Sequence, residues 1–254
     1  MRGAGLGPAF RPVRAGLRRR PRPGRRRAHG PLRVLSTLLI AAGLLFIVDA
    51  GLTVAWQEPV SALYARLQQK GLADDLSTFE RAAPTPGELA ALERLKSDRR
   101  RIAFLARALR GRVDEGEPIG RIRIPRIGAS FVVVEGTEPG DLRKGPGRYA
   151  DTSLPGLPGT FALAGHRTTY LSPFRDIDKL GRGSDVVVEM PYGRFTYEVF
   201  GKRIVDPSDV GVLAAVPRER RLVLTACHPL YSARQRIVVL ARLVLTEPRG
   251  RASA

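Results

Sequence analysis

Leu222-Val223-Leu224-Thr225-Ala226-Cys227-His228-Pro229 is the stretch of this chain that decides both its fold and its chemistry. An apolar run of β-forming residues leads to Cys227, and a proline follows two residues later, which predicts a strand that ends close to the thiol. Cys227 is the only cysteine among 254 residues, so the chain has no second thiol for an internal disulfide or for a tetrathiolate metal site. The residue is therefore either a buried filler or a nucleophile.

The half of the chain that contains Cys227 has the pattern of an all-β domain. From about Asp114 onward, short apolar stretches alternate with Gly and Pro, and residues 194–200 alternate polar and apolar side chains as a half-buried antiparallel strand does. We predict a mainly β fold, a closed or nearly closed antiparallel barrel of seven to eight strands. The expected strands are residues 121–124, 131–135, 160–164, 185–189, 194–205, 222–225 and 236–245.

A long apolar segment near the N-terminus predicts a membrane anchor. Residues 34–56 are 23 residues with a single charge, Asp49, and about 20 residues suffice to cross a bilayer core. The preceding residues 1–33 contain eleven arginines and no acid. Their charge of +11 is more than half of the net charge of +19. The positive-inside rule places that end in the cytoplasm, and Trp56 suits the opposite interface. We expect a single-pass plasma-membrane protein with an extracytoplasmic C-terminal domain.

Two alternatives to the anchor follow from the same residues. A basic tract can bind nucleic acid through phosphate contacts, but an apolar span directly behind the tract favours the topological interpretation. Val48-Asp49-Ala50 resembles a signal-peptide cleavage site, but the apolar run is longer than a usual signal peptide core. We therefore expect a retained anchor, the lipid bilayer as a partner and no nucleic acid.

Changes of composition divide the chain into five parts. Residues 1–33 are a basic, disordered cytoplasmic tail, residues 34–56 a transmembrane helix, and residues 248–254 a disordered tail. Residues 57–113 have helical periodicity, which predicts a helical stalk or appendage. Residues 114–247 are the expected β-barrel. The first helical stripe is Val60, Leu63, Tyr64 and Leu67.

A cysteine nucleophile acts as a thiolate and needs a base, usually histidine. His29 lies in the expected cytoplasmic tail, and His228 would share a strand with Cys227 and point to the other face unless the strand ends before it. His166 remains, at the end of Phe161-Ala162-Leu163-Ala164-Gly165-His166, where an apolar strand, a small residue and a reactive residue follow one another as they do at Cys227. We expect one barrel rim to bring His166 and Cys227 together; the alternative is a loop histidine that only forms hydrogen bonds.

Thiolate attack on a carbonyl also requires a donor for the oxyanion. Arg234 and Arg236 follow Cys227 after a short loop, which would return the chain antiparallel to the cysteine strand and place an arginine opposite the thiol. Spacing alone does not separate the two arginines, and a solvated arginine at a strand start is the alternative for either one.

These motifs together resemble the sortases, the membrane-anchored cysteine transpeptidases of mostly Gram-positive bacteria. The resemblance covers roughly residues 114–247, and the Cys-His-Pro ending with the Ala-Gly-His-Arg-Thr-Thr-Tyr loop is most similar to the class E sortases of Actinobacteria. It implies that Cys227 is the nucleophile, His166 the acid/base and Arg236, which directly precedes an Ile-Val-Val strand, the oxyanion-stabilising residue. The motifs are Gly120-Arg121-Ile122-Arg123-Ile124-Pro125, Leu163-Ala164-Gly165-His166-Arg167, Leu224-Thr225-Ala226-Cys227 and Arg236.

Two positions depart from the family pattern. Ala226 precedes the cysteine where Thr is common, a small-for-small change that we expect to leave the chemistry unaltered. Arg148 precedes Tyr149 where relatives often have His, and we expect this change to affect the substrate groove more than the catalytic centre.

The resemblance implies a two-step acyl transfer with no cofactor and no metal. Cys227 would cleave an LPXTG- or LAXTG-like sorting signal at Thr-Gly through a thioester, and an amine on a cell-wall precursor or a pilin would accept the acyl group. The partners are then secreted proteins that carry a C-terminal sorting signal. The alternatives are another cysteine acyl-transfer enzyme of the cell wall, such as an L,D-transpeptidase or a papain-like peptidase, and a catalytically idle barrel that serves as a scaffold.

Overall fold

The structure is a computed structural model that describes residues 30–56, 59–81, 85–216 and 218–253. The chain forms two compact units, Met1–Val48 and Asp49–Ala254. Residues 1–29 of the expected basic tail, with His29, residues 57–58 and 82–84 of the expected appendage, residue 217 of the expected barrel and residue 254 of the expected C-terminal tail lie outside the described residues.

The apolar segment forms one helix. Helix α1 spans Gly30–Trp56, and within it Arg33–Gly51 has a mean hydropathy of 2.2. An α-helix rises 1.5 Å per residue, so the length and composition of α1 suit either a membrane anchor or a signal sequence.

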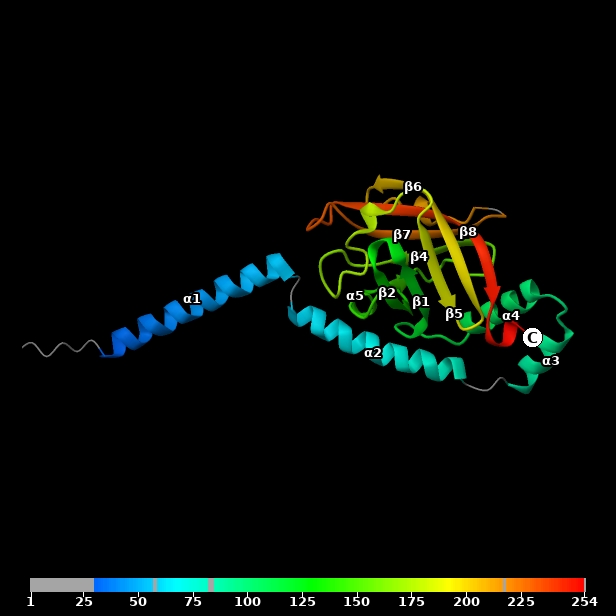
Figure 1. Ribbon diagram of the computed structural model, residues 1–254, viewed down its shortest axis with the longest axis horizontal. Coiled ribbons are helices and arrows are strands. Elements are labelled where there is room, and N and C mark those ends of the chain that lie inside the picture. Colours follow the sequence, from blue (N-terminus) through cyan, green and yellow to red (C-terminus); the bar gives the residue numbers. More distant parts are fainter. Residues whose placement is uncertain (1–29, 57–58, 82–84, 217, 254) are drawn as a thin grey trace, which may run out of the picture. The chain divides into compact units, whose positions relative to one another are not determined.

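The C-terminal unit is built on a closed barrel of eight strands (Figure 1). Around the barrel the order is β1-β2-β3-β4-β7-β8-β6-β5, and β5 pairs with β1 to close it. The strands are β1 (Pro118–Ile124), β2 (Ala129–Glu135), β3 (Gly147–Arg148), β4 (Gly159–Ala164), β5 (Asp185–Met190), β6 (Gly193–Val205), β7 (Arg220–His228) and β8 (Gln235–Pro248). The predicted closed barrel and its seven expected strands are confirmed, but the expectation that the barrel is antiparallel is wrong for two of the strand pairs.

The barrel is mixed rather than wholly antiparallel. β2 pairs with β3 and β4 pairs with β7 in parallel, and the other pairs are antiparallel. Parallel neighbours need a long connection, and β5, β6 and the three segments that join them to each other and to their neighbours provide one between β4 and β7. The short strand β3 was not predicted, because two residues carry no periodic pattern.

Side chains from alternate strand positions fill the inside of the barrel and cover part of its outside. Phe161, Phe195 and Tyr197 are fully buried inside, and burial raises the pKa of the Tyr197 hydroxyl. A smaller cluster lies outside, over β4, β7 and β8; it consists of Ala162, Val223, Val238 and Leu240 with Tyr149, Phe200, Val205, Val212 and Leu213 packed against them. We call this set the outer cluster.

Three helices of the expected appendage pack against the barrel. Helix α2 (Pro59–Arg81) buries Leu72 and Leu76 against β2, and α4 (Asp98–Arg110) contributes its apolar face to the main core. Helix α3 (Pro86–Arg94) begins with a capping box in which Thr85 and Glu88 exchange hydrogen bonds.

Shorter helices lie in the connections, and one falls in the expected tail. The short helices are α5 (Pro139–Leu142) and the 3-10 turns η1 (Pro125–Ile127), η2 (Ile177–Lys179), η3 (Val210–Leu213) and η4 (Gly250–Ala252). Residues 248–254 were expected to be disordered, but strand β8 extends to Pro248 and η4 follows, with Ala252 buried in the main core. A buried methyl group gives this segment an apolar anchor that its polar composition did not predict.

Candidate active site

His166, Cys227 and Arg236 lie at the same end of three adjacent strands. In the parallel pair of β4 and β7, Ala164 is level with Thr225, and the Gly165 N–H continues the ladder by donating to the Thr225 carbonyl over 3.1 Å. His166 and Cys227 each follow two residues after this last pair, so both lie just beyond it at the same end of the sheet. In the antiparallel pair of β7 and β8, Cys227 is directly opposite Arg236.

The alternation of side chains puts Cys227 and Arg236 on one face of the barrel. Leu224 and Ala226 belong to the core inside the barrel, whereas Val223 belongs to the outer cluster. Cys227 has the parity of Val223 and therefore faces outward. Arg236 has the parity of Val238 in the outer cluster and shares this face.

The Cys227 thiol is free and half-buried. Two residues upstream, the Thr225 hydroxyl lies 2.9 Å from the Tyr149 hydroxyl, which links β7 to the segment after β3. Tyr149 also packs on the outer cluster. The face of the sheet next to the thiol is therefore apolar, with one hydroxyl pair and a partly exposed rim that includes Tyr149 and Leu213.

His166 is half-buried, and its environment favours the neutral ring. Burial lowers the pKa of the imidazole from 6.5, and the positive charge of Arg143 lowers it further. The Tyr170 ring lies 5.3 Å from the His166 ring, and Arg143 lies 6.0 Å from the centre of the Tyr170 ring. At neutral pH the ring is therefore in the form that accepts a proton.

An unusual turn and a helix hold Tyr170 beside His166. Tyr170, Leu171 and Ser172 all have positive φ angles, a conformation that costs about 1 kcal/mol or more for each residue that is not glycine. The Tyr64 ring of α2 stands edge-on to Tyr170, with centroids 6.4 Å apart. Helix α2 therefore reaches the loop that follows His166.

Arg236 is half-buried and is held by the β7–β8 turn. Its Nη1 donates to the carbonyls of Ala233 and Gln235 over 3.0 and 3.1 Å. Arg234, the alternative from spacing, is exposed and precedes β8. Of the two arginines, the register brings Arg236 to Cys227.

His228 is less suited to serve Cys227. Strand β7 continues through His228, so the two neighbours point to opposite faces. The Nδ1 atom of His228 lies 3.5 Å from Nη1 of Arg167, and because a guanidinium only donates, Nδ1 accepts in this weak contact. His29 lies outside the described residues.

Sequence reasoning did not assign several residues at this site. Tyr149, Tyr170 and Arg143 reach it from separate loops, and no spacing rule connects such loops in advance. Arg167 directly follows His166 in the sequence motif, and this adjacency was the only feature of the sequence that pointed to a place at the site.

Arg148 does not have the role in the groove that we expected. Its guanidinium pairs with the Glu135 carboxylate through bonds of 2.7 and 2.5 Å and also donates to the Thr152 carbonyl. Both side chains of the pair are buried, and Tyr149 next door, not Arg148, packs on the outer cluster. A fixed bidentate pair suits a role in stability.

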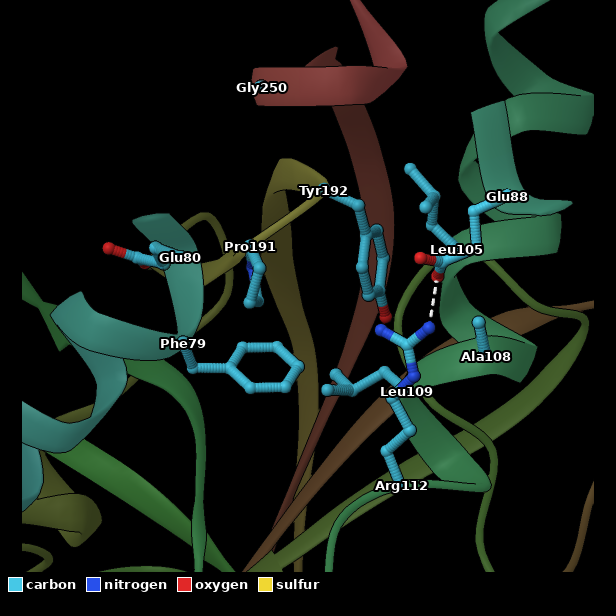
Figure 2. Close-up of a pocket in the computed structure, with 10 residues that line it drawn as sticks. All are labelled: Phe79, Glu80, Glu88, Leu105, Ala108, Leu109, Arg112, Pro191, Tyr192 and Gly250. Carbon is cyan, nitrogen blue, oxygen red and sulfur yellow. Dashed lines mark ion pairs between the residues drawn. The ribbon is translucent and has the colours of Figure 1, made fainter. Parts of the chain in front are cut away.

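A small pocket lies at the other end of the barrel (Figure 2). Its volume is about 100 Å³, and Phe79, Leu109 and Tyr192 line it together with the ion pair of Arg112 and Glu88. Tyr192 belongs to the turn between β5 and β6. The strand that follows this turn begins beside the C-terminal end of β8, whereas Arg236 lies at the N-terminal end of β8. Ligand pockets usually exceed about 300 Å³, so this pocket does not compete with the Cys227 site as the catalytic centre.

Comparison with known proteins identifies the barrel. The chain matches the family model described as the sortase domain over residues 122–244. It is 30% identical over 185 residues to sortase D of Bacillus subtilis, covering 73% of this chain and 87% of the relative. In the part of the chain that the structure describes, no group of three or more His, Cys, Asp and Glu side chains is placed to hold a metal ion.

Solved structures agree with this identification. A Clostridium perfringens sortase D5 transpeptidase is similar in fold, with a TM-score of 0.57 and 23% identity over 70% of this chain and 99% of that one. Sortase E1 from Streptomyces coelicolor, solved with a tripeptide in the active site, has a TM-score of 0.50 and 30% identity over 55% of this chain and 98% of that one. The expected resemblance to class E is confirmed, and class D is similar as well. The chain therefore belongs to the sortase family and is a sortase-type transpeptidase.

Proposed function

We propose that this sortase cleaves an LPXTG- or LAXTG-like sorting signal between Thr and Gly, with Cys227 as nucleophile, His166 as acid/base and Arg236 as oxyanion donor. The observation that supports the proposal is that β4 and β7 pair in parallel up to Ala164 and Thr225, two residues before His166 and Cys227, and that Cys227 is paired with Arg236 across β7 and β8. The acceptor of the acyl group is an amine on a cell-wall precursor or on a pilin.

The first half of the reaction forms a thioester. The neutral His166 ring accepts the Cys227 proton as the sulfur attacks the Thr carbonyl carbon. The π electrons of the C=O bond move to the carbonyl oxygen, which becomes the oxyanion and re-forms the C=O bond when the leaving group departs. The imidazolium then donates its proton to the Gly nitrogen, the C–N bond breaks, and the glycine fragment leaves as an amine. The lowered pKa of His166 supports this sequence, because it favours the neutral ring that accepts the thiol proton and makes the imidazolium a better proton donor to the leaving amine than an unperturbed one.

Arg236 stabilises the charge on the carbonyl oxygen. A guanidinium has five N–H donors, so two bonds from Nη1 to the turn carbonyls can hold its direction while another donor faces the oxyanion. Its place opposite Cys227 supports this role better than the exposed position of Arg234 does.

The second half of the reaction transfers the acyl group. An acceptor amine attacks the thioester carbon and loses a proton to His166, and the C–S bond breaks to release the Cys227 thiolate, which then recovers the proton. Splitting amide exchange into two steps through a good leaving group lowers each barrier.

The outer cluster is the proposed floor for the sorting signal. Its apolar side chains and the Thr225–Tyr149 hydroxyl pair lie beside Cys227 on the same face. The tripeptide in the active site of the sortase E1 relative supports peptide binding at the equivalent site.

We further propose that α1 is a retained anchor with the N-terminus in the cytoplasm. The eleven arginines before it support this orientation. An anchor would confine the enzyme, the tethered substrate and a lipid-linked acceptor to one membrane face and so raise their effective concentration.

The test is a peptide-cleavage assay on the full-length chain in detergent, with fluorogenic LPXTG, LAXTG and LPXTA peptides. We expect cleavage at Thr-Gly for the first two sequences and none with Cys227→Ala. Turnover retained by Cys227→Ala would reject the mechanism. A wild type that cleaves none of the peptides would favour the scaffold alternative.

A further inference from the structure

Arg167, which follows His166, has a completely buried guanidinium. Its side chain is 2% exposed. Burial of a cation costs several kcal/mol unless partners replace the lost water, so the contacts of this group show what it holds together.

The partners of Arg167 come from two other segments near His166: the loop that leads into η2 and the end of β7. Nε and Nη2 donate to the Arg175 carbonyl over 3.0 and 2.9 Å, and Nη2 pairs with an Asp178 oxygen at 2.7 Å. Nη1 donates to the Cys227 carbonyl over 3.4 Å and contacts His228 at 3.5 Å. One side chain thus joins the strand end of His166, the strand end of Cys227 and the loop up to η2.

The two strand ends are otherwise joined by the β4–β7 ladder, which reaches only Gly165 and Thr225. His166 and Cys227 both lie beyond that last backbone bond. Each residue has other backbone support, because the Phe174 N–H donates to the His166 carbonyl over 3.0 Å and Cys227 is paired in the β7–β8 ladder, but neither bond joins the two strand ends to each other. Side-chain contacts between the strand ends therefore contribute to their separation, and proton transfer requires hydrogen-bond reach of about 3 Å. Arg167 is covalently next to one residue and hydrogen-bonded to the carbonyl of the other.

We propose that Arg167 is a positioning residue that sets the distance between the His166 imidazole and the Cys227 thiol. The inference rests on the proposed roles of those two residues. The contacts of the Arg167 guanidinium are with the Arg175 and Cys227 carbonyls, Asp178 and His228, none of which is a reacting atom.

Charge alone does not explain this arrangement. Asp178 is half-exposed, so a lysine could reach the carboxylate and keep the ion pair. A lysine cannot span the Arg175 and Cys227 carbonyls at the same time, because it has one nitrogen where Arg has three in a planar fork. Arg167→Lys therefore separates a positioning role from a role in charge balance.

Arg148 is a matched control for loss of a buried arginine. Its side chain is 3% exposed and has a bidentate carboxylate partner, but its bonds go to Glu135 and Thr152 and not to the catalytic row. Arg148→Lys should lower the stability of the fold to a similar degree. It should not change the coupling of His166 to Cys227, by which we mean the effect of His166→Ala on the reactivity of the Cys227 thiol.

The experiment is a double-mutant cycle on the full-length chain. Cys227 is the only cysteine, so its alkylation rate by iodoacetamide at pH 7 reports on this thiol alone. We expect His166→Ala to slow alkylation roughly tenfold in the wild type and less than about twofold with Arg167→Lys, since removing the shared link uncouples the pair. With Arg148→Lys the His166 effect should stay at roughly tenfold.

Peptide cleavage provides a second readout. Arg167→Lys should lower kcat by about tenfold or more and change KM by less than about threefold, because geometry in the transition state is lost and peptide contacts are kept. A full His166 effect with Arg167→Lys, or a wild-type kcat in that variant, would overturn the proposal.

If circular dichroism shows Arg167→Lys to be unfolded, Asp178→Asn decides the question. This variant weakens the hold on the guanidinium and leaves Arg167 in place. Reduced coupling of His166 to Cys227 then supports the proposal, and unchanged coupling overturns it. A wild type that alkylates normally but cleaves no peptide would reject the proposed function and not the positioning role.

Discussion

Cys227 and Arg236 lie directly opposite each other in the antiparallel ladder of β7 and β8. The two side chains face the same side of the sheet, next to the outer cluster. This pairing supports the proposed role of Arg236 as donor to the oxyanion that forms when the thiolate attacks a carbonyl.

Arg236→Lys tests that pairing. Loss of one preorganised oxyanion donor costs about 10² to 10³ in kcat, so we expect a drop of that size with a small change in KM. Arg234→Lys is the matched control, because Arg234 is exposed and precedes β8. Equal losses in steady-state peptide cleavage for the two variants would contradict the assignment of Arg236.

The lowered pKa of His166 predicts a pH dependence of stability. Between the folded-state pKa and the ordinary value of 6.5, the unfolded chain binds more protons than the folded chain. The contribution of His166 to stability is therefore fully present above pH 6.5 and is lost as the pH falls through this window. We expect the thermal midpoint of the wild type to fall relative to that of His166→Gln as the pH is lowered; a constant difference would contradict the direction of the shift.

The same group predicts the acid limb of activity. Cleavage needs the neutral imidazole, so kcat/KM should fall on acidification with a midpoint below 6.5. Arg143→Gln removes the second cause of the lowered pKa and should move that midpoint upward. An unchanged midpoint would show that Arg143 does not act on His166.

The hydroxyl pair of Tyr149 and Thr225 is expected to shape the peptide site. Tyr149→Phe removes a hydrogen bond of 2.9 Å and should lower stability by about 1 kcal/mol. Because the pair lies beside Cys227 and not on it, we expect KM for the sorting peptide to rise while kcat changes less. A large loss of kcat at unchanged KM would contradict this division.

Gln69 is predicted to hold helix α2 on the barrel. Its amide accepts from the Val132 N–H over 2.7 Å and donates to the carbonyls of Val132 and Lys144 over 3.0 and 2.8 Å. Gln69→Ala leaves these backbone groups without partners, at a cost of about 1–3 kcal/mol. The neighbouring Gln68→Ala is the control, and equal thermal midpoints for the two variants would contradict this role.

Much of the fold followed from local sequence pattern. The strict alternation of polar and apolar side chains over residues 194–200 predicted β6, and Gly and Pro residues predicted the ends of most other strands. What local pattern did not contain was pairing between distant segments: β4 and β7 lie side by side in parallel although 55 residues separate Ala164 from Arg220 in the chain. The mixed character of the barrel depends on that pairing.

The candidate site divides in the same way. The sequence indicated Cys227 and His166 because each follows an apolar run of residues. Spacing left Arg234 and Arg236 open and the resemblance to the sortases favoured Arg236, the residue that is paired with Cys227 in the ladder of β7 and β8. Tyr170 could not be predicted, because its place beside His166 depends on three consecutive left-handed residues. Arg167 required knowledge of what a buried guanidinium contacts.

The most direct test of the mechanism is detection of the acyl-enzyme. The full-length chain is incubated with a sorting peptide without an acceptor amine, quenched with acid and analysed by intact mass and peptide mapping. We predict an adduct with the mass of the fragment up to Thr, located on Cys227, released by hydroxylamine and absent from Cys227→Ala. Cleavage of the peptide at Thr-Gly without any adduct on Cys227, and with equal rate in Cys227→Ala, would contradict the mechanism.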